Sequence, residues 1–427
     1  MKRKTLLRVA APLLALTLVA GACGGDDDTE NADAGQVAGS DTTAAPTAET
    51  VSTETGAATL RAGLTDLLSE HVYLAALATG SALRGDNAGF EAYAAALNGP
   101  TDSNSADLIA AVSSAYGAET GKAFDGLWRS EDHIPAFVAY TQAAAKDDKA
   151  GKDAAVQRLT SYAKTFGDTM NKVNENLPAK AVSDAITSHA TTLLKVIDAQ
   201  KAGDQPTVYQ SLRGAYHHMD MTAAALAGGT AKKFPEKFDG DAAASGAELR
   251  AGLHSLLREH VWLAASATGG ALGGRMPQFE AAAAALNGPS NSNTADIVSA
   301  VGGVYGAEVG KAFDGLWRSE DHIPGFVAYT QAVAKNDQAG KDAAVKRLTS
   351  YAKTFGTTMN SVNSNLPADV VEKAITGHAT TLIAVIDAQK AGDAAKVASL
   401  LRDAVHHMSG TADALASATA KQFPDKF

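Results

Sequence analysis

The sequence predicts an all-α protein in which two tandem antiparallel helical bundles, of four-helix-bundle or ferritin-like type, follow a disordered tether. Three observations support this prediction. The segment 60–238 recurs as 249–427, shifted by 189 positions. Apolar residues return at helical spacing within each copy, and no stretch alternates convincingly with a period of two. Aromatic residues make up only 6% of a chain rich in Ala and Gly, which favours closely packed helices.

Residues 1–23 are typical of a targeting segment rather than of a folded domain. Four basic residues precede the apolar run Val9–Ala20, and the run ends shortly before Cys23, the only cysteine of the chain. We predict a lipoprotein signal peptide, with Cys23 as the lipidated (palmitate-bearing) first residue of the mature protein. An ordinary secretory signal with an incidental cysteine is the alternative. The mature chain then has no second thiol, which excludes disulfides and thiolate metal sites.

The charge is distributed unevenly along the chain. The formal net charge is −10, and because the signal segment carries +4, the mature chain carries −14. Residues 24–58 contain no Lys or Arg and almost no large apolar residue. This composition cannot form a core, so it predicts a disordered acidic, Thr-rich linker. Nothing in it suggests a nucleic-acid partner.

The first repeat, residues 59–238, is predicted to form four to five helices joined by short loops. A long helical region starts near Ser103, is interrupted near Gly117 or Gly121, and contains a helix start or a kink at Pro135. Residues 239–246 form a short linker, and the second repeat, 247–427, follows the same pattern. The five long helical segments predicted for the first repeat are 59–83, 103–145, 152–175, 179–201 and 205–231, and a short helix is predicted at 88–97.

Histidines are the chemically distinctive residues of the repeat. Only His254 is unpaired, because the first repeat has Thr65 at that position. The five matched pairs are His71/His260, His133/His322, His189/His378, His217/His406 and His218/His407.

Helical geometry places four of these histidines toward the bundle interior. His71 and His189 share faces with Leu and Val, whereas His217 falls on a polar face. His189 and His218 each lie about 21–22 Å from the turn at Gly203, given a rise of about 1.5 Å per residue. The same counting brings His133 to the level of residues 162–166. We therefore predict one histidine layer per bundle.

A metal ion would satisfy such a layer, because neutral imidazole is the commonest metal ligand and bundle cores often hold such sites. A hydrogen-bonded polar layer and a cavity for haem or another ligand are the alternatives. Copper is preferred over zinc and iron, because Met219 and Met221 follow the last histidines of the first repeat; Met408 matches Met219, whereas Gly410 replaces Met221. The predicted ligands are His71, His133, His189 and His218 in the first repeat, and His260, His322, His378 and His407 in the second.

Acidic residues next to the ligands are candidates for hydrogen-bond partners of the ligand rings. Neighbours on a helix diverge by about 100°, so Glu70 and His71 cannot both face one centre. A solvated rim is the alternative reading. A di-iron site is disfavoured, because the Glu-x-x-His spacing is absent at these positions. The candidates for supporting residues are Glu70, Glu131, His217, Glu259, Glu320 and His406.

A set of short motifs resembles an uncharacterised group of secreted bacterial helical-repeat proteins, some of which carry a copper amine oxidase label derived from attached stalk domains. The resemblance covers both repeats and implies an extracytoplasmic location and a helical fold, but it transfers no catalytic residue. The motifs are EHV at 70–72, Trp128 followed by DHI at 132–134, the lone His189, HHM at 217–219 and the closing QFPDKF at 422–427.

These patterns together predict a metal-binding protein anchored to the outer face of the cell membrane, for sequestration or delivery of the metal. Four nitrogen ligands would close a tetrahedral site, which argues against catalysis. A structural or adhesive envelope module with polar histidine layers, and a metal-dependent oxidase, are the alternatives. The expected partners are the membrane, through the lipid anchor, the metal ion and an unidentified envelope protein.

Overall fold

The computed structural model describes residues 52–319 and 321–427, which belong to one compact unit. The described residues contain sixteen helices and no strand, so the predicted all-α class is confirmed. The predicted signal peptide, Cys23 and most of the predicted linker lie outside the described residues. The end of that linker is folded: Thr53 is buried, and the first helix begins at Gly56 rather than at residue 59.

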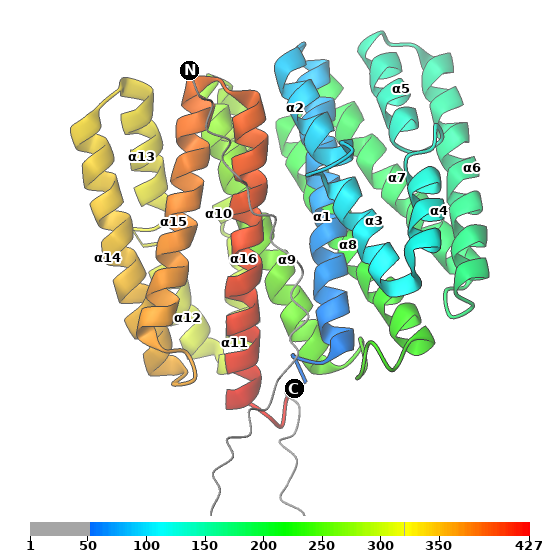
Figure 1. Ribbon diagram of the computed structural model, residues 1–427. Helices are drawn as coiled ribbons and strands as arrows, with labels where there is room; N and C mark the ends of the chain where they lie inside the picture. Colours follow the sequence, from blue (N-terminus) through cyan, green and yellow to red (C-terminus); the bar gives the residue numbers. More distant parts are fainter. Residues whose placement is uncertain (1–51, 320) are drawn as a thin grey trace, which may run out of the picture. The chain divides into compact units, whose positions relative to one another are not determined.

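Each repeat contributes eight helices, more than the four to five predicted (Figure 1). Those of the first repeat are α1 (Gly56–Leu83), α2 (Asn87–Asn98), α3 (Asn104–Tyr116), α4 (Ala118–Trp128), α5 (Ile134–Ala145), α6 (Lys149–Val173), α7 (Ala179–Ala202) and α8 (Gln205–Lys233). Those of the second repeat are α9 (Ser245–Leu272), α10 (Met276–Asn287), α11 (Asn293–Tyr305), α12 (Ala307–Trp317), α13 (Ile323–Lys335), α14 (Gln338–Val362), α15 (Ala368–Ala391) and α16 (Ala394–Gln422).

The extra helices arise because the predicted helical region 103–145 is divided into α3, α4 and α5. Gly117 separates the first two helices with a φ of 94°, a value that favours glycine. Pro135 then stands in the first turn of α5, where its missing N–H costs no hydrogen bond. The proline therefore marks a helix start rather than a kink.

Polar residues at the N-caps define where the long helices begin. The side chains of Thr55, Asp148 and Asp204 accept hydrogen bonds from the backbone N–H groups three residues further on in α1, α6 and α8. Gly203 ends α7 in the left-handed conformation and permits the tight turn into α8. These signals explain why the predicted bounds 179–201 and 205–231 fall within two residues of α7 and α8.

Small residues let the long helices approach closely. A Cβ added to Gly167 of α6 would lie 2.3 Å from the carbonyl oxygen of Ala179 at the start of α7. Further along α7, Leu193, Val196 and Ile197 are fully buried. Complete burial of such side chains contributes about 1.5–3 kcal/mol each, so this face of α7 is a main source of stability.

The two repeats pack on each other through α1 and α9, which run side by side (Figure 1). The rings of Tyr73 and Trp262, at equivalent positions of the two repeats, stack with centroids 5.2 Å apart and planes 6° apart. Both side chains are fully buried. Since equivalent residues meet, the repeats contact each other as two copies related by a pseudo-twofold axis. Residues of both repeats belong to one hydrophobic cluster.

The ion pairs between the two repeats are related by the same pseudo-twofold axis. Glu70 of the first repeat contacts Arg402 of the second, and Glu259 of the second contacts Arg213 of the first. The two pairs are equivalent, because Glu259 lies 189 positions after Glu70 and Arg402 lies 189 positions after Arg213. The acidic residue is fully buried in both. The repeats are therefore held by matched, buried charge pairs in addition to apolar packing.

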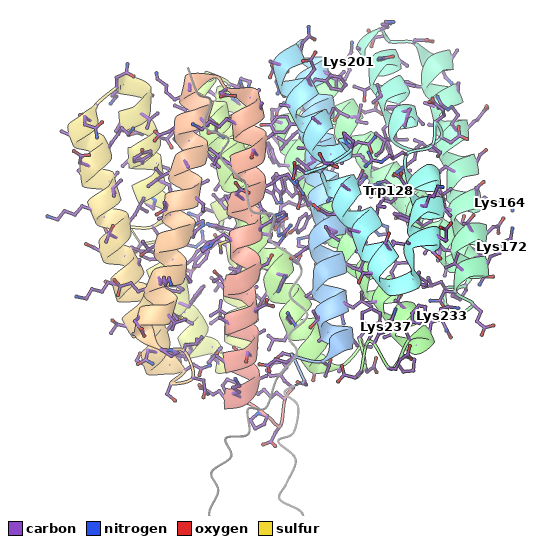
Figure 2. All side chains as sticks on the ribbon, viewed as in Figure 1. Trp128, Lys164, Lys172, Lys201, Lys233 and Lys237 are labelled. Atoms are coloured by element: carbon purple, nitrogen blue, oxygen red, sulfur yellow. The ribbon has the colours of Figure 1, made fainter. Side chains whose placement is uncertain are left out.

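Charged side chains cover the outer helices, as Figure 2 shows for Lys164 and Lys172, which extend away from α6. The same view places Trp128 on α4. Among the helices of the described residues, none combines the length and the apolar character needed to cross a bilayer.

Candidate metal centre

The three residues that form the candidate centre of the first repeat come from two long helices and one loop. His71 lies in the middle of α1, and His189 lies on α7. His133 occupies the N-cap of α5, with φ −109° and ψ −104°, in the short connection that follows α4. The prediction that His133 lies within a helix is therefore wrong. Because Pro135 starts α5, this imidazole lies at the N-terminal end of the helix. All three side chains are at most 4% exposed.

The three imidazoles meet in the interior. His71, His133 and His189 each offer a ring nitrogen, and these nitrogens all lie within 4.8 Å of one another. Ring centroids of His71 lie 5.6 Å from those of both partners. In a tetrahedral site with metal–nitrogen distances of about 2.0–2.1 Å, ligand nitrogens are about 3.3 Å apart. Side-chain rotations that shorten the distances between these nitrogens by up to about 1.5 Å would therefore bring them to coordination distance.

The second repeat builds the same group. His260, His322 and His378 also place their ligand nitrogens within 4.8 Å of one another. The centroid distances from His260 to the other two rings are both 5.5 Å. We call these two groups the triads of the first and second repeat.

The backbone fixes the tautomer of one histidine in each triad. Nδ1 of His133 lies 2.8 Å from the carbonyl oxygen of Trp128, and Nδ1 of His322 lies 2.8 Å from that of Trp317. A carbonyl oxygen only accepts, so Nδ1 carries the proton and Nε2 keeps its lone pair. Metal-binding histidines are commonly oriented by a hydrogen bond of this kind.

Aromatic rings hold the same histidine on its other sides. The ring of Tyr162 stacks on His133 with a centroid distance of 4.6 Å and an interplanar angle of 2°. Trp128 presents an edge to His133 at 4.6 Å and to His71 at 5.0 Å. Residue counting along the helices predicts Tyr162 at the level of His133, but it assigns the tyrosine no role at the centre. Its position on the apolar face of α6 was the available signal.

Burial keeps the triads neutral. Loss of hydration lowers the pKa of His133 to about 4, with the hydrogen bond to Trp128 opposing the shift. Loss of hydration and then the neighbouring histidines lower the pKa of His189 to about 3 and that of His71 well below its ordinary value. Neutral imidazoles are the form that binds metals, so the triads are ready to coordinate at neutral pH.

Several buried ring nitrogens lack a hydrogen-bond partner within the described part of the chain. They include Nδ1 of His71, His189 and His260, and both nitrogens of His378. A buried polar atom without a partner costs about 1–3 kcal/mol, so it calls for an explanation. A bound cation would supply the missing partner for one nitrogen of each ring.

The fourth predicted ligand of each repeat is not a member of the triad. Nε2 of His218 lies 3.0 Å from the carbonyl oxygen of Ala185, and Nε2 of His407 lies 2.9 Å from that of Ala374. Both histidines are half-buried. The carbonyl contacts occupy Nε2, so these residues border the triads without sharing their geometry.

Glu70 and Glu259 serve the contact between repeats. Nε2 of His406 lies 2.7 Å from Oε2 of Glu70, and Arg258 donates to the same oxygen at 3.1 Å. Burial would raise the pKa of Glu70, but the hydrogen bond and charge of His406 and the charges of Arg402 and Arg258 lower it to about 2. Glu70 is therefore committed to the partner repeat rather than to the ring of His71.

The remaining supporting candidates also lie away from the triads. His217 lies 3.6 Å from Oε1 of Glu259 and 3.4 Å from Oδ2 of Asp220. The side chain of Glu131 is 88% exposed, and its carboxylate lies 3.6 Å from Arg158. Glu131 thus belongs to the solvated rim. Glu320 lies outside the described residues.

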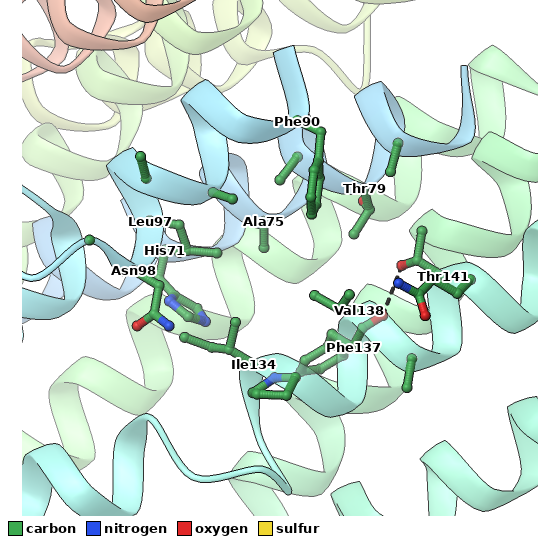
Figure 3. Close-up of a pocket in the computed structure, with 18 of the residues that line it drawn as sticks. His71, Ala75, Thr79, Phe90, Leu97, Asn98, Ile134, Phe137, Val138 and Thr141 are labelled. Atoms are coloured by element: carbon green, nitrogen blue, oxygen red, sulfur yellow. Dashed lines mark hydrogen bonds between the residues drawn. The ribbon is translucent and has the colours of Figure 1, made fainter. Parts of the chain in front are cut away.

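A cavity reaches the first triad from the side of α2 and α5. Figure 3 shows His71 at one end of this space, with Phe90, Ile134 and Val138 along it. Its volume is about 620 Å³. In the second repeat, a pocket of about 900 Å³ is lined by His260, His322 and His378 together. The pocket of the second repeat thus reaches the whole triad, whereas the cavity of the first repeat reaches His71 but neither His133 nor His189.

No similar protein was found. Comparisons with models of protein families, with curated proteins and with solved structures give no match to this chain. What the site does must therefore be inferred from its own geometry.

Proposed function

We propose that each repeat binds one transition-metal ion through its histidine triad, and that the protein sequesters or delivers this metal outside the cytoplasm. The observation that carries the proposal is the duplicated group of three buried, neutral imidazoles, with ligand nitrogens within 4.8 Å of one another. The tautomer fixed by the Trp128 and Trp317 carbonyls and the unpartnered ring nitrogens support it.

Copper remains the preferred metal, with zinc and iron as the alternatives. Imidazole suits all three ions. Met408, at most 2% exposed, lines the same pocket as the triad of the second repeat, and thioether sulfur favours Cu(I). Met219 occupies the equivalent buried position in the first repeat.

Three protein ligands leave a fourth coordination position open. In zinc proteins, three protein ligands and one open position are typical of catalytic sites, whereas structural sites are closed by four. A metal-dependent enzyme, an oxidase if the metal is copper or iron, is therefore the second candidate function. Metal-dependent turnover of an oxidisable substrate by the loaded protein would favour this candidate over storage.

The metal content of the purified chain tests the proposal. After titration with Cu(I), Zn²⁺ or Co²⁺ and removal of excess metal, we expect about two ions per chain. His133→Asn keeps a side-chain N–H that can donate to the Trp128 carbonyl but removes the ligand nitrogen, so it should retain about one ion. His133→Asn combined with His322→Asn should retain none.

His218→Ala combined with His407→Ala is the matched control, since both residues lie beside the triads but outside them. This variant should keep about two ions per chain. Wild-type protein that retains no metal would refute the proposal. Loss of metal from the control variant would instead indicate sites of four histidines.

We also propose that a lipid on Cys23 anchors the protein to the outer face of the cell membrane. The apolar run before this lone cysteine supports the proposal. Cys23→Ser should move the protein from the membrane fraction to the soluble extracytoplasmic fraction, as measured by immunoblotting of fractionated cells. A variant that stays in the membrane fraction, as wild type is expected to do, would contradict lipid anchoring.

A further inference from the structure

The pocket beside the second triad has the size and lining of a small-molecule site. Its volume of about 900 Å³ lies within the range of about 300–1,000 Å³ that is usual for such sites. All three triad histidines line it, together with His407. Apolar side chains of α15 and α16, including Val371, Ile375 and Leu415, form much of the remaining wall.

Within the described part of the chain, no carboxylate belongs to the group of ligand nitrogens around a bound ion. Imidazole is a neutral ligand, so an ion held by the triad keeps its full positive charge, which is +1 for Cu(I) and +2 for Zn²⁺ or Co²⁺. Glu259, next to His260 in the sequence, is engaged by Arg213 and Asn293. Glu372 and Asp369 line the same pocket but precede His378 by six and nine residues, or about 9 and 14 Å of helix. A buried charge without a counter-ion is costly, so the open position favours an anion.

We propose that the metal of the second repeat takes as its fourth ligand the carboxylate of a small molecule with an apolar body, of about the size of a medium-chain fatty acid. The inference rests on the proposed metal site. The carboxylate binds the metal at the triad, and the apolar body lies along α15 and α16. This arrangement pairs the anionic head with the cation and removes the apolar tail from water.

Two glycines distinguish this pocket from the equivalent region of the first repeat. Gly377 and Gly410 line the pocket, and the first repeat has Ser188 and Met221 at these positions. A Cβ on Gly377 would lie 2.5 Å from the ring of His407, so this glycine permits the observed position of the ring. A Cβ on Gly410 would meet nothing within 4 Å. The equivalent Met221 is 66% exposed, so Gly410→Met adds a side chain at the rim of the pocket, in a form that the chain already tolerates on the equivalent helix.

Binding of octanoate to the cobalt-loaded full chain tests the inference. A His133→Asn background leaves metal only in the second repeat, and the visible spectrum of Co²⁺ reports its coordination. We expect one octanoate per chain to change this spectrum. Acetate should bind more than about tenfold more weakly, because it buries no chain. Octan-1-ol, which lacks the charge, should leave the spectrum unchanged.

Adding Gly410→Met to this background should weaken octanoate binding by about tenfold without changing the cobalt content. Gly303→Met is the matched control, because Gly303 is an exposed helical glycine with nothing within 4 Å of its added Cβ and does not line the pocket. Octanoate that binds no better than acetate, or equally well to the Gly410→Met variant, would overturn the inference. Cobalt content is measured before octanoate is added, so failure of the metal site is recognised separately and overturns both proposals.

Discussion

Replacing Glu70 with glutamine is expected to lower the free energy of unfolding by about 3 kcal/mol while leaving the metal content unchanged. The Glu70 carboxylate is fully buried and contacts Arg402, Arg258 and His406 of the second repeat. Removing one partner of a buried ion pair typically costs about 3–5 kcal/mol, because the other charge is left buried. In this variant Arg258 would still pair with Asp66, whose Oδ1 lies 3.2 Å from its Nε. The expected loss of stability is therefore at the lower end of this range.

Urea denaturation followed by circular dichroism measures this loss, and metal analysis of the same sample measures the content. Glu259→Gln is the pseudo-symmetric counterpart and should behave similarly, since Glu259 contacts Arg213. Glu131→Gln is the matched control at an exposed site and should change stability by less than about 0.5 kcal/mol. Should Glu70→Gln instead lose metal affinity by about 10–100-fold at unchanged stability, Glu70 would support the ligands after all.

The role of Glu70 in the contact between repeats could not be predicted from the sequence. Its neighbour His71 was placed correctly on the apolar face of α1, because helical periodicity fixes that direction. The same periodicity turns Glu70 about 100° away, toward a surface that a single repeat leaves undefined. Only the packing of α1 on α9 shows that this surface is buried against a second repeat with its own arginines. Contacts between repeats have no local sequence signal, so this role could not be predicted.

Counting residues along the helices predicted three members of each triad. His71, His133 and His189 do meet at one level, and the equivalent residues meet in the second repeat. The fourth predicted ligand, His218, lies outside the triad: helical geometry assigned it only to the border of the apolar face, and the carbonyl of Ala185 contacts its ring nitrogen. The helix break before Pro135 was recognised only as one of two possibilities. A loop position for His133 follows once the proline is seen to start α5.

A site of three histidines differs in its possible functions from the predicted site of four. Four ligands were expected to close the coordination sphere, which disfavoured catalysis. In the proposed site, three ligands and an adjoining apolar pocket would leave a position for a ligand or a substrate. Storage, delivery and catalysis therefore share one geometry, and they differ in what occupies the fourth position and how fast it exchanges.

Without metal, the stability of the folded chain is expected to fall steeply as the pH drops from about 6.5 to 4. Unfolded histidines bind protons near their ordinary pKa of about 6.5, whereas folded His133 does so only near its lowered pKa of about 4. In this window the unfolded chain binds more protons, so stability rises with pH. One residue shifted this far accounts for roughly 3 kcal/mol. His322 repeats the shift, and His189 and His378 add to it with pKa values of about 3.

His254 should act in the opposite direction. This imidazole is 3% exposed, and Asp66 and Asp413 lie 3.0 and 2.8 Å from its two ring nitrogens. Burial would lower its pKa, but the charges and hydrogen bonds of the two carboxylates raise it to about 9. Its stabilising effect is complete below pH 6.5 and is lost as the pH rises toward 9. The two effects together predict maximal stability of the metal-free protein near neutral pH.

Urea denaturation from pH 4 to 9 in the presence of a chelator measures the free energy of unfolding as a function of pH. The loss of stability toward acid pH is called the acid limb of this profile, and the loss toward pH 9 the alkaline limb. His133→Asn combined with His322→Asn should flatten the acid limb, since asparagine does not titrate. His254→Thr, which introduces the residue of the first repeat, should flatten only the alkaline limb. An acid limb of unchanged slope in the double variant would show that the triads are not the groups that resist protonation. Saturating metal should lower the pH at which the wild-type chain unfolds, because an ion bound only to the folded state stabilises it by mass action.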